Sequence, residues 1–238
     1  MSKIIIDDEF WDVFPNAQLN ILTVTNIRNQ YPEDERSYFS GLLCEAAIEA
    51  RRYLANETFS QNPVIDEWRK AFGQFKTKKG ARSSIEALLK RVSQGREFAP
   101  INPLVDIYNS ISLKYAVPCG GEDLHLIEGD LHLGKAKGGE AFLPLGADHD
   151  SPALPEEIIY YDTEGAICRC LNWREAQRTM LTEDTTAAVL VIESINKEQA
   201  YRANQAMDEM KVLIDTFFHT KSATEILTRA KSSFTYHI

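Results

Sequence analysis

The spacing of hydrophobic residues changes near Gly121. This change limits the possible folds of the chain more than any other feature of the sequence. Before Gly121, apolar residues recur mainly at the three- and four-residue spacing of amphipathic helices. After Gly121, short apolar runs separated by Gly, Pro, Asp and Thr are typical of strands. Because no internal repeat divides the 238 residues, the pattern predicts one α+β domain whose helices pack on a sheet.

The individual elements follow from spacing and from capping residues. Asn62, Ser83 and Asn102 are expected to cap helices, with Pro63 and Pro103 as first helical residues. The expected helices cover residues 34–56, 62–75, 83–95, 102–117 and 197–218. The expected strands cover residues 16–27, 130–136, 141–146, 156–162, 166–173 and 187–194. We therefore divide the domain, residues 1–238, into a helical N-terminal portion (1–99), a sheet-rich core with a closing helix (100–218) and a C-terminal tail (219–238).

Charge is unevenly distributed along the chain. The net charge of −9 disfavours broad attraction to nucleic acid. Residues 68–96, however, hold nine basic residues against one acid, and residues 121–164 hold eleven acids against two lysines. The basic segment is either a solvated helical surface or a face that approaches phosphates. In the second case the candidate RNA contacts are Lys76, Lys78, Lys79 and Arg82.

Several classes of protein are disfavoured by composition. The longest apolar runs are too short to span a bilayer, and the acids that follow the three N-terminal isoleucines are unlike a signal peptide. We expect a cytoplasmic protein without a membrane partner. The four cysteines lack CxxC spacing and are expected to be buried free thiols. His125 and His132 could face each other across a hairpin, but no cofactor and no metal are expected.

The stretch from Asn102 to Leu124 carries more polar groups than its packing requires. Its apolar stripe explains a helix, and Gly120-Gly121 is expected to form a tight turn in which backbone packs closely. The remaining polar residues are candidates for one wall of a binding site: Asp106, Asn109, Glu122 and Asp123.

A second group of polar residues begins within an apolar strand at Arg169. An unpaired guanidinium there would be costly, so Arg169 should meet a carboxylate or an anionic ligand. Asp106, Asp123 and Asp162 are the candidate partners, and either an internal ion pair or a ligand contact would satisfy it. The same segment supplies further candidate binding residues: Asn172, Trp173, Arg174 and Gln177.

The order of these residues resembles the B3/B4 domain of the bacterial phenylalanyl-tRNA synthetase β subunit. It is still more similar to free-standing B3/B4-domain proteins. The matching positions are Asp106 and Asn109 in a helix, Pro118 and Asp123 in a turn, Gly139 and Glu140 before a strand, Tyr161, Asp162 and Gly165 in a hairpin, and Thr182 and Thr185 before the closing strand. The resemblance implies an α+β fold with mixed β-sheets of unusual topology, covered by helices.

In the synthetase this domain is an editing site, which hydrolyses the ester of tyrosine wrongly attached to the phenylalanine tRNA. The chain departs from that pattern at the editing residues. Gly120 stands where the synthetase has a histidine, and "CRCLNWRE" replaces a glycine-rich strand end. Met180 or Thr179 falls nearest to the synthetase glutamate. The resemblance thus implies the location of a pocket, between the Asn109 helix, the Gly120 turn and residues 169–177, while the catalytic residues stay unassigned.

Two functions are consistent with these observations. The first is hydrolysis, in trans, of the ester of a mischarged aminoacyl-tRNA, a reaction that a positioned water and a polarised carbonyl can support. The second is a non-catalytic binding module for tRNA, an amino acid or a small carboxylate metabolite. The expected partners are accordingly tRNA or aminoacyl-tRNA in the first case and a small ligand in the second.

Overall fold

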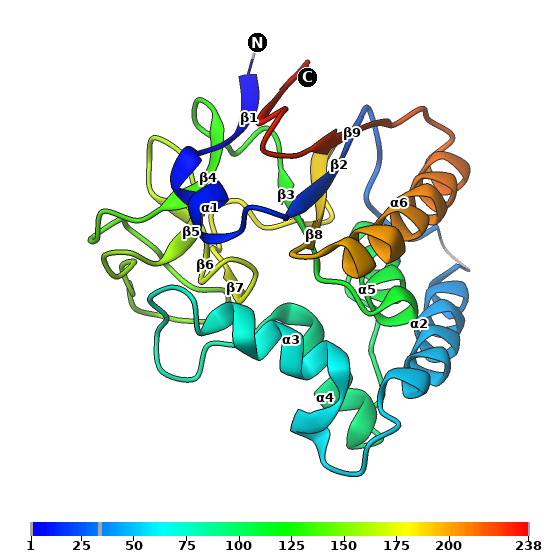
Figure 1. The fold of residues 1–238 in the computed structure, drawn as a ribbon. Helices are drawn as coiled ribbons and strands as arrows, with labels where there is room; N and C mark the ends of the chain where they lie inside the picture. The colour runs from blue at the N-terminus through cyan, green and yellow to red at the C-terminus, as the bar shows by residue number, and fades with distance from the viewer. Residues whose placement is uncertain (1, 33–34, 238) are drawn as a thin grey trace.

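A computed structural model describes residues 2–32 and 35–237 of the chain. The described helices are α1 (Asp8–Val13), α2 (Arg36–Ala50), α3 (Pro63–Phe72), α4 (Ser84–Ser93), α5 (Pro103–Tyr115) and α6 (Lys197–Phe217), with short 3₁₀ turns at Arg51–Tyr53 and Phe59–Gln61. The described strands are β1 (Ser2–Ile6), β2 (Gln18–Thr25), β3 (Cys119–Asp123), β4 (Leu131–Lys135), β5 (Ile158–Tyr161), β6 (Ala166–Arg169), β7 (Arg174–Glu175), β8 (Ala187–Ser194), β9 (Ala223–Leu227) and β10 (Ser233–Tyr236). The two ends of the chain lie side by side (Figure 1), because β1 pairs with β10.

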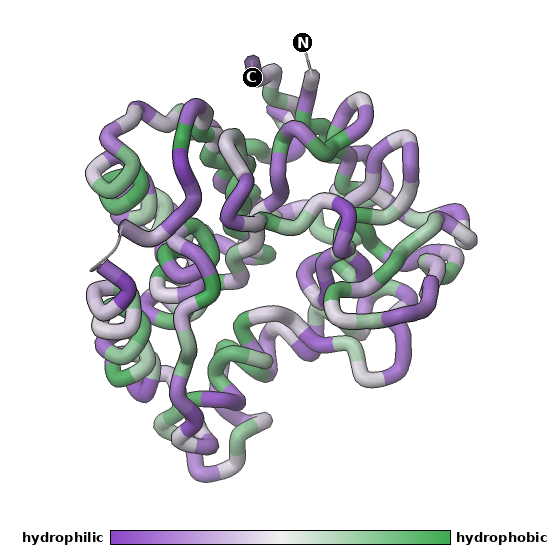
Figure 2. The backbone as a smooth tube through the Cα atoms, turned by 180° about the vertical axis from the view of Figure 1, so that it is seen from behind, coloured by the Kyte–Doolittle hydropathy of each residue, from purple (hydrophilic) through white to green (hydrophobic). Residues whose placement is uncertain are grey.

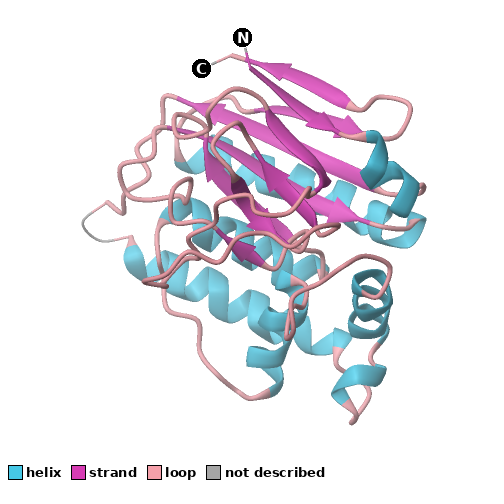
Figure 3. Cartoon of the chain, turned by 90° about the vertical axis from the view of Figure 1, so that its left-hand side faces the viewer, coloured by secondary structure: helices cyan, strands magenta, loops and turns pink. Residues whose placement is uncertain are grey.

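The strands form two sheets, and both contain strands distant in sequence. The first sheet has the order β10-β1-β4-β5-β6-β7 and is mixed, since β1 and β4 run parallel while its other neighbours are antiparallel. The second sheet has the order β3-β8-β2-β9 and is antiparallel. Figure 3 shows the strands gathered in one part of the molecule and most of the helices in another. The α+β class is confirmed, with helices that cover the sheets, but only the first of the two sheets is mixed.

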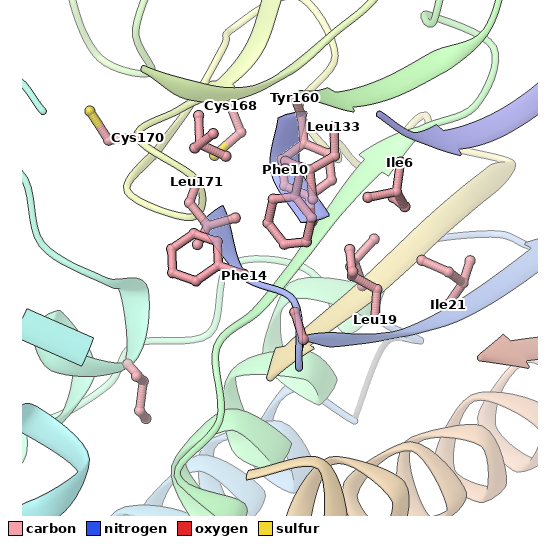
Figure 4. Close-up of a cluster of buried hydrophobic side chains, with 14 of the residues drawn as sticks. Ile6, Phe10, Phe14, Leu19, Ile21, Leu133, Tyr160, Cys168, Cys170 and Leu171 are labelled. Carbon is pink, nitrogen blue, oxygen red and sulfur yellow. The ribbon is translucent and has the colours of Figure 1, made fainter. Parts of the chain in front are cut away.

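The main hydrophobic core lies between the two sheets. Because side chains alternate along a strand, Val189 and Val191 of β8 face this core, while Leu190 and Ile192 belong to a second cluster on the other face. Figure 4 shows Leu19 and Ile21 of β2 close to Ile6 and its neighbours in the same core. Burial of such large apolar surfaces on both faces of β8 fixes its register, since a slip of one residue would exchange the two sets.

The helices divide between the two clusters. On the outer face of the second sheet, α6 packs against β8 and β2, α5 packs against β3, and α2 packs on α5. Their apolar residues, such as Phe39, Ile111 and Met210, belong to the second cluster. α3 and α4 instead contribute Trp68 and Leu89 to the core between the sheets. The alternation of hydrophobic and hydrophilic residues along the helices is visible in Figure 2 and matches this one-sided burial.

Most of the expected elements are confirmed, with their ends adjusted. The strands expected at 16–27 and 187–194 are β2 and β8, and the five expected helices are α2 to α6. Ser83 and Asn102 cap their helices by accepting hydrogen bonds from Glu86 N and Val105 N. Asn62 does not cap α3, because its side-chain amide bonds the backbone of the preceding loop instead.

Three expectations about elements are wrong. Residues 141–146 form a loop with a single β-bridge at Pro144, whose ring leaves no N–H for a ladder. Gly120-Gly121 lies within β3 and not in a turn, because β3 pairs along its whole length with β8. Residues 219–238 are more than a tail, since β9 and β10 add an edge to each sheet.

Candidate functional site

A small cavity of about 40 Å³ lies between the two sheets. A volume of that size holds about three water-sized groups, at roughly 10–15 Å³ each. Its wall comes from both sheets and from the turn after β6 and consists of Gly120, Gly121, Glu122, Leu131, Tyr160, Cys168, Asn172, Glu175, Val191 and Glu193. The cavity is unusual for the interior of this protein because three of its wall residues are glutamates.

Strand register explains why the three glutamates meet. Glu122 of β3 pairs with Val189 of β8, so it shares the inward face with Val191 and Glu193. Glu175 of β7 pairs with Cys168 of β6, another residue of the cavity wall. The second sheet therefore supplies two of the carboxylates, and the first sheet supplies the third.

The turn that returns β7 onto β6 has an uncommon backbone conformation. Cys170 and Leu171 have φ angles of 50° and 64°, in the left-handed region that residues other than glycine rarely adopt. Both side chains are fully buried, and this packing holds the strained turn in place. The turn brings Glu175 opposite Cys168 and so completes the cavity.

Glu193 is held in place by two neutral donors. Its Oε1 accepts a hydrogen bond of 2.9 Å from the Tyr160 hydroxyl, and its Oε2 accepts one of 3.2 Å from the Asn172 amide. The Asn172 carbonyl oxygen in turn accepts a bond of 3.3 Å from the backbone N–H of Ser84 at the start of α4. Asn172 thereby connects the cavity to the loop that precedes α4.

Burial makes the three carboxyl groups weaker acids than usual. It raises the pKa of Glu193 to about 7 and that of Glu175 to about 7. Burial, reinforced by the nearby charge of Glu175, raises the pKa of Glu122 well above its ordinary value. Within residues 2–32 and 35–237 none of the three carboxylates forms an ion pair, and Glu122 Oε2 has no hydrogen-bond partner. Glu175 and Glu193 therefore gain and lose a proton near neutral pH.

The two glycines of β3 contribute in different ways. A Cβ on Gly120 would point toward the cavity, 3.6 Å from Glu175 Oε1, which is an ordinary van der Waals distance. A Cβ on Gly121 would lie 2.3 Å from Leu190 Cδ2, on the face that packs against the helices. The absence of a side chain at Gly120 keeps the cavity open, whereas Gly121 lets β3 pack closely, as expected from the sequence.

Four of the residues predicted to form a binding site line this cavity. They are Gly120, Gly121, Glu122 and Asn172. The other predicted residues of the first stretch lie elsewhere. Asp106 accepts hydrogen bonds from the Tyr31 hydroxyl and from Ile101 N, and Asn109 is a partly exposed residue of α5 outside the cavity wall. Asp123 accepts a bond from His125 N.

Arg169 has a different partner from those expected. Its guanidinium forms a bidentate, fully buried ion pair with Glu157, with N–O distances of 2.8 and 2.5 Å, and also donates to the Ser151 carbonyl. The proposed pairing with Asp106, Asp123 or Asp162 is wrong. Glu157 directly precedes β5, the neighbour of β6, and takes the place of these partners, while Asp162 pairs with Arg178. Of the two interpretations left open by the sequence, an internal ion pair or a ligand contact, the structure shows the internal ion pair.

The other predicted residues of this segment also serve local structure. Arg174 lies over the Trp173 ring, with 5.1 Å between the guanidinium carbon and the ring centroid. The Gln177 amide donates to the carbonyl oxygens of Pro144 and Ala147, and so fixes the loop before it. Trp173 packs at the edge of the main core.

Sequence reasoning missed Tyr160, Glu175 and Glu193. Glu193 offered a signal, since it follows Val189 and Val191 at two-residue spacing and so must share their inward face. Glu175 offered none, because β7 is only two residues long and depends on the left-handed turn that precedes it.

The predicted RNA contacts lie in the loop between α3 and α4. Lys76, Lys78, Lys79 and Arg82 are all exposed. Lys78 donates a hydrogen bond of 2.5 Å to Ser151 Oγ, which attaches this loop to the loop that also receives Arg169. The basic loop ends at Ser84, whose N–H holds Asn172 in the cavity wall.

The remaining histidines and cysteines form no common site. His132 Nδ1 lies 2.9 Å from the Asp7 carboxylate, and its ring stacks on Tyr161, so these residues are its partners and not His125. All four cysteines are free; Cys44 is exposed, and the other three are buried, so the expectation of burial is wrong for Cys44 alone. Over the described ranges, no cluster of three or more His, Cys, Asp or Glu side chains has the geometry to hold a metal ion. No described helix has the length and hydrophobicity needed to cross a membrane.

Comparison with known proteins adds one assignment. A family model for the B3/4 domain matches residues 67–226. Among solved structures, the chain is similar to an N-terminal fragment of the phenylalanyl-tRNA synthetase β subunit from Pyrococcus horikoshii, with 14% identity and a TM-score of 0.46. That match covers 92% of this chain and 49% of the fragment, so the chain spans about half the length of that protein. No curated protein matches the chain.

Proposed function

The chain belongs to the B3/4 domain family, and from this premise we propose that it hydrolyses the ester bond of aminoacyl-tRNA in trans. The observation that carries the proposal is the carboxylate of Glu175, which lies over Gly120 in the cavity and has its pKa raised to about 7 by burial. A general base is most effective when its pKa is near the working pH, and few carboxylates meet that condition.

The reaction requires little beyond a positioned base. The ester carbonyl is placed at the mouth of the cavity, and the ionised Glu175 accepts a proton from a water molecule. The water oxygen attacks the carbonyl carbon and forms a tetrahedral intermediate. This intermediate collapses with cleavage of the carbon–oxygen bond to the ribose, and the departing ribose oxygen takes the proton back from Glu175. The products are the free amino acid and the tRNA.

The basic loop supplies the contact for the tRNA. Lys76, Lys79 and Arg82 are exposed and have no partner among the described residues, so they are free to bind phosphates. The loop ends at Ser84, next to Asn172 of the cavity wall. A tRNA acceptor end held by this loop would therefore have its terminal ester within reach of the cavity.

The alternative of a module that binds a small carboxylate metabolite has less support. Arg169, which motivated that alternative, is saturated by Glu157 and Ser151. The cavity itself is lined by three glutamates, which would repel a carboxylate ligand.

The test is a deacylation assay on a panel of aminoacyl-tRNAs, with release of the labelled amino acid as the readout. We expect hydrolysis of at least one member of the panel, with a rate that rises with pH and levels off above about 7. Glu175→Gln should lower kcat by about 10²-fold or more. Glu45→Gln, an exposed change on α2, is the matched control and should leave kcat unchanged.

Salt dependence tests the contact with tRNA. The double variant Lys76→Ala/Lys79→Ala should raise KM at low salt and reduce the slope of log KM against log salt by about two, since each lysine that leaves a phosphate contact removes about one. Lys197→Ala/Lys221→Ala, which removes two exposed lysines elsewhere, should change neither. Failure to hydrolyse any aminoacyl-tRNA in the panel would refute the proposed function.

A further inference from the structure

Glu122 is the one carboxylate of the cavity that has an unpartnered buried oxygen and no assigned chemical role. Its side chain is 8% exposed, and its Oε2 has no partner among the described residues. Glu193, by contrast, accepts from Tyr160 and Asn172. A buried carboxylate oxygen without a donor is costly, so a ligand that brings N–H donors and positive charge would gain most at Glu122 Oε2.

The α-ammonium group of an aminoacyl ester has these properties. It carries a positive charge and three N–H donors, as a lysine ammonium does. A charge-assisted hydrogen bond to a buried carboxylate is about twice as strong as a neutral one. The neighbouring charges of Glu175 and Glu193 add to this attraction, because all three carboxylates line the same small space.

The size of the cavity limits what can accompany the ammonium group. About 40 Å³ admits about three non-hydrogen atoms, at roughly 10–15 Å³ for each water-sized group. The ammonium nitrogen, Cα and Cβ of an amino acid fill that space. A phenol or benzyl side chain has more than twice as many atoms. The walls at Leu131, Tyr160 and Val191 are buried on paired strands and packed in the main core, so they offer no room for an aromatic ring.

We infer that the cavity binds the α-ammonium group of an aminoacyl ester through Glu122 and accepts a side chain of at most one non-hydrogen atom. The substrate class is thus the ester of glycine or alanine. This inference rests on the proposed function for the reaction, but the binding that it describes can be measured without hydrolysis.

Three amides that resist hydrolysis separate the requirements. L-alaninamide has the ammonium group and a small side chain, N-acetyl-L-alaninamide lacks the charge, and L-tyrosinamide has the charge with a large side chain. Calorimetry and thermal shift at pH 7, where an α-amine of pKa about 7.7–8.0 is still mostly protonated, should detect L-alaninamide and give at least about tenfold weaker binding for the other two.

Two substitutions test the placement. Glu122→Gln resembles the protonated form of Glu122 and should fold, yet it should weaken L-alaninamide binding at least about tenfold. Gly120→Ala adds a methyl group at an ordinary van der Waals distance from Glu175, so the fold should persist while L-alaninamide is excluded. Gly41→Ala, at an exposed helical glycine with nothing within 4 Å of the added Cβ, is the matched control and should bind like the wild type.

The outcomes separate this inference from the proposed function. Binding of L-alaninamide without hydrolysis of alanyl-tRNA would support the ligand class and contradict the hydrolase. Tighter binding of L-tyrosinamide than of L-alaninamide, equal binding of the acetylated amide, or no binding of any amide would overturn the inference. Hydrolysis of tyrosyl-tRNA alone would overturn it while leaving the hydrolase in place.

Discussion

The clearest physical consequence of the cavity is a dependence of stability on pH that a single substitution should remove. Glu193 is 4% exposed and its pKa is raised from 4.5 to about 7, chiefly by burial. The folded protein therefore binds a proton at Glu193 over a pH range in which the unfolded chain has released it. Stability from this group is fully present below about pH 4.5 and is lost as pH rises through about 7.

The magnitude follows from the size of the pKa shift. At 1.36 kcal/mol for each pKa unit, the rise from 4.5 to about 7 corresponds to a loss of about 3 kcal/mol of unfolding free energy between low pH and pH 8. Glu193→Gln removes the titration. The glutamine oxygen can still accept a hydrogen bond from Asn172, and its amide can donate to the Tyr160 hydroxyl oxygen.

The assay is urea denaturation of wild type and Glu193→Gln from pH 4.5 to pH 8. Because groups outside the cavity titrate alike in both proteins, the difference in unfolding free energy isolates Glu193 together with its interaction with Glu175. It should shift in favour of the variant by about 3 kcal/mol as pH rises, or by about 6–12 °C in Tm for a chain of this size. Glu45→Gln on the exposed face of α2 should show no such shift. A difference that stays constant across this range would refute the argument that burial raises the pKa of Glu193.

Three further predictions concern the framework around the cavity. Arg169→Met should lower unfolding free energy by about 3–5 kcal/mol, because it leaves Glu157 buried without its partner, and adding Glu157→Met should restore much of the loss in the same denaturation assay. Gly121→Ala should destabilise by about 1–3 kcal/mol through overlap with Leu190, whereas Gly41→Ala should stabilise by up to about 1 kcal/mol in matched thermal melts. Asn102→Ala should cost about 1–2 kcal/mol, measured by chemical denaturation, through loss of the cap of α5.

The sequence was sufficient for those elements whose stability is local or whose apolar pattern is strong. The apolar run "AAVLVIES" predicts β8, and the Asn102 cap followed by a proline predicts the start of α5. β3 could not be recognised, because a strand that contains two adjacent glycines has little propensity of its own and depends on pairing with β8. β10 is short and mostly polar, and it exists because β1 offers an edge for pairing.

The candidate site was harder to predict than the fold for the same reason. Glu122 and Asn172 were noticed as polar residues in apolar surroundings, and both line the cavity. Arg169 was noticed on the same argument, yet Glu157 satisfies it internally. A buried polar residue can be inferred from sequence, but its partner is set by strand pairing across the sheets, which a single sequence does not reveal.

The partner therefore decides which buried charges belong to a site. Arg169 and Glu157 neutralise each other, and hydrophobic residues of similar size could replace the pair with little loss of stability. The three glutamates of the cavity have no such compensation among the described residues, and burial opposes their ionisation. Apolar residues at these positions would give a more stable core. Places where a chain retains such a cost are characteristically functional sites, and binding of the proposed ammonium group would offset part of this cost.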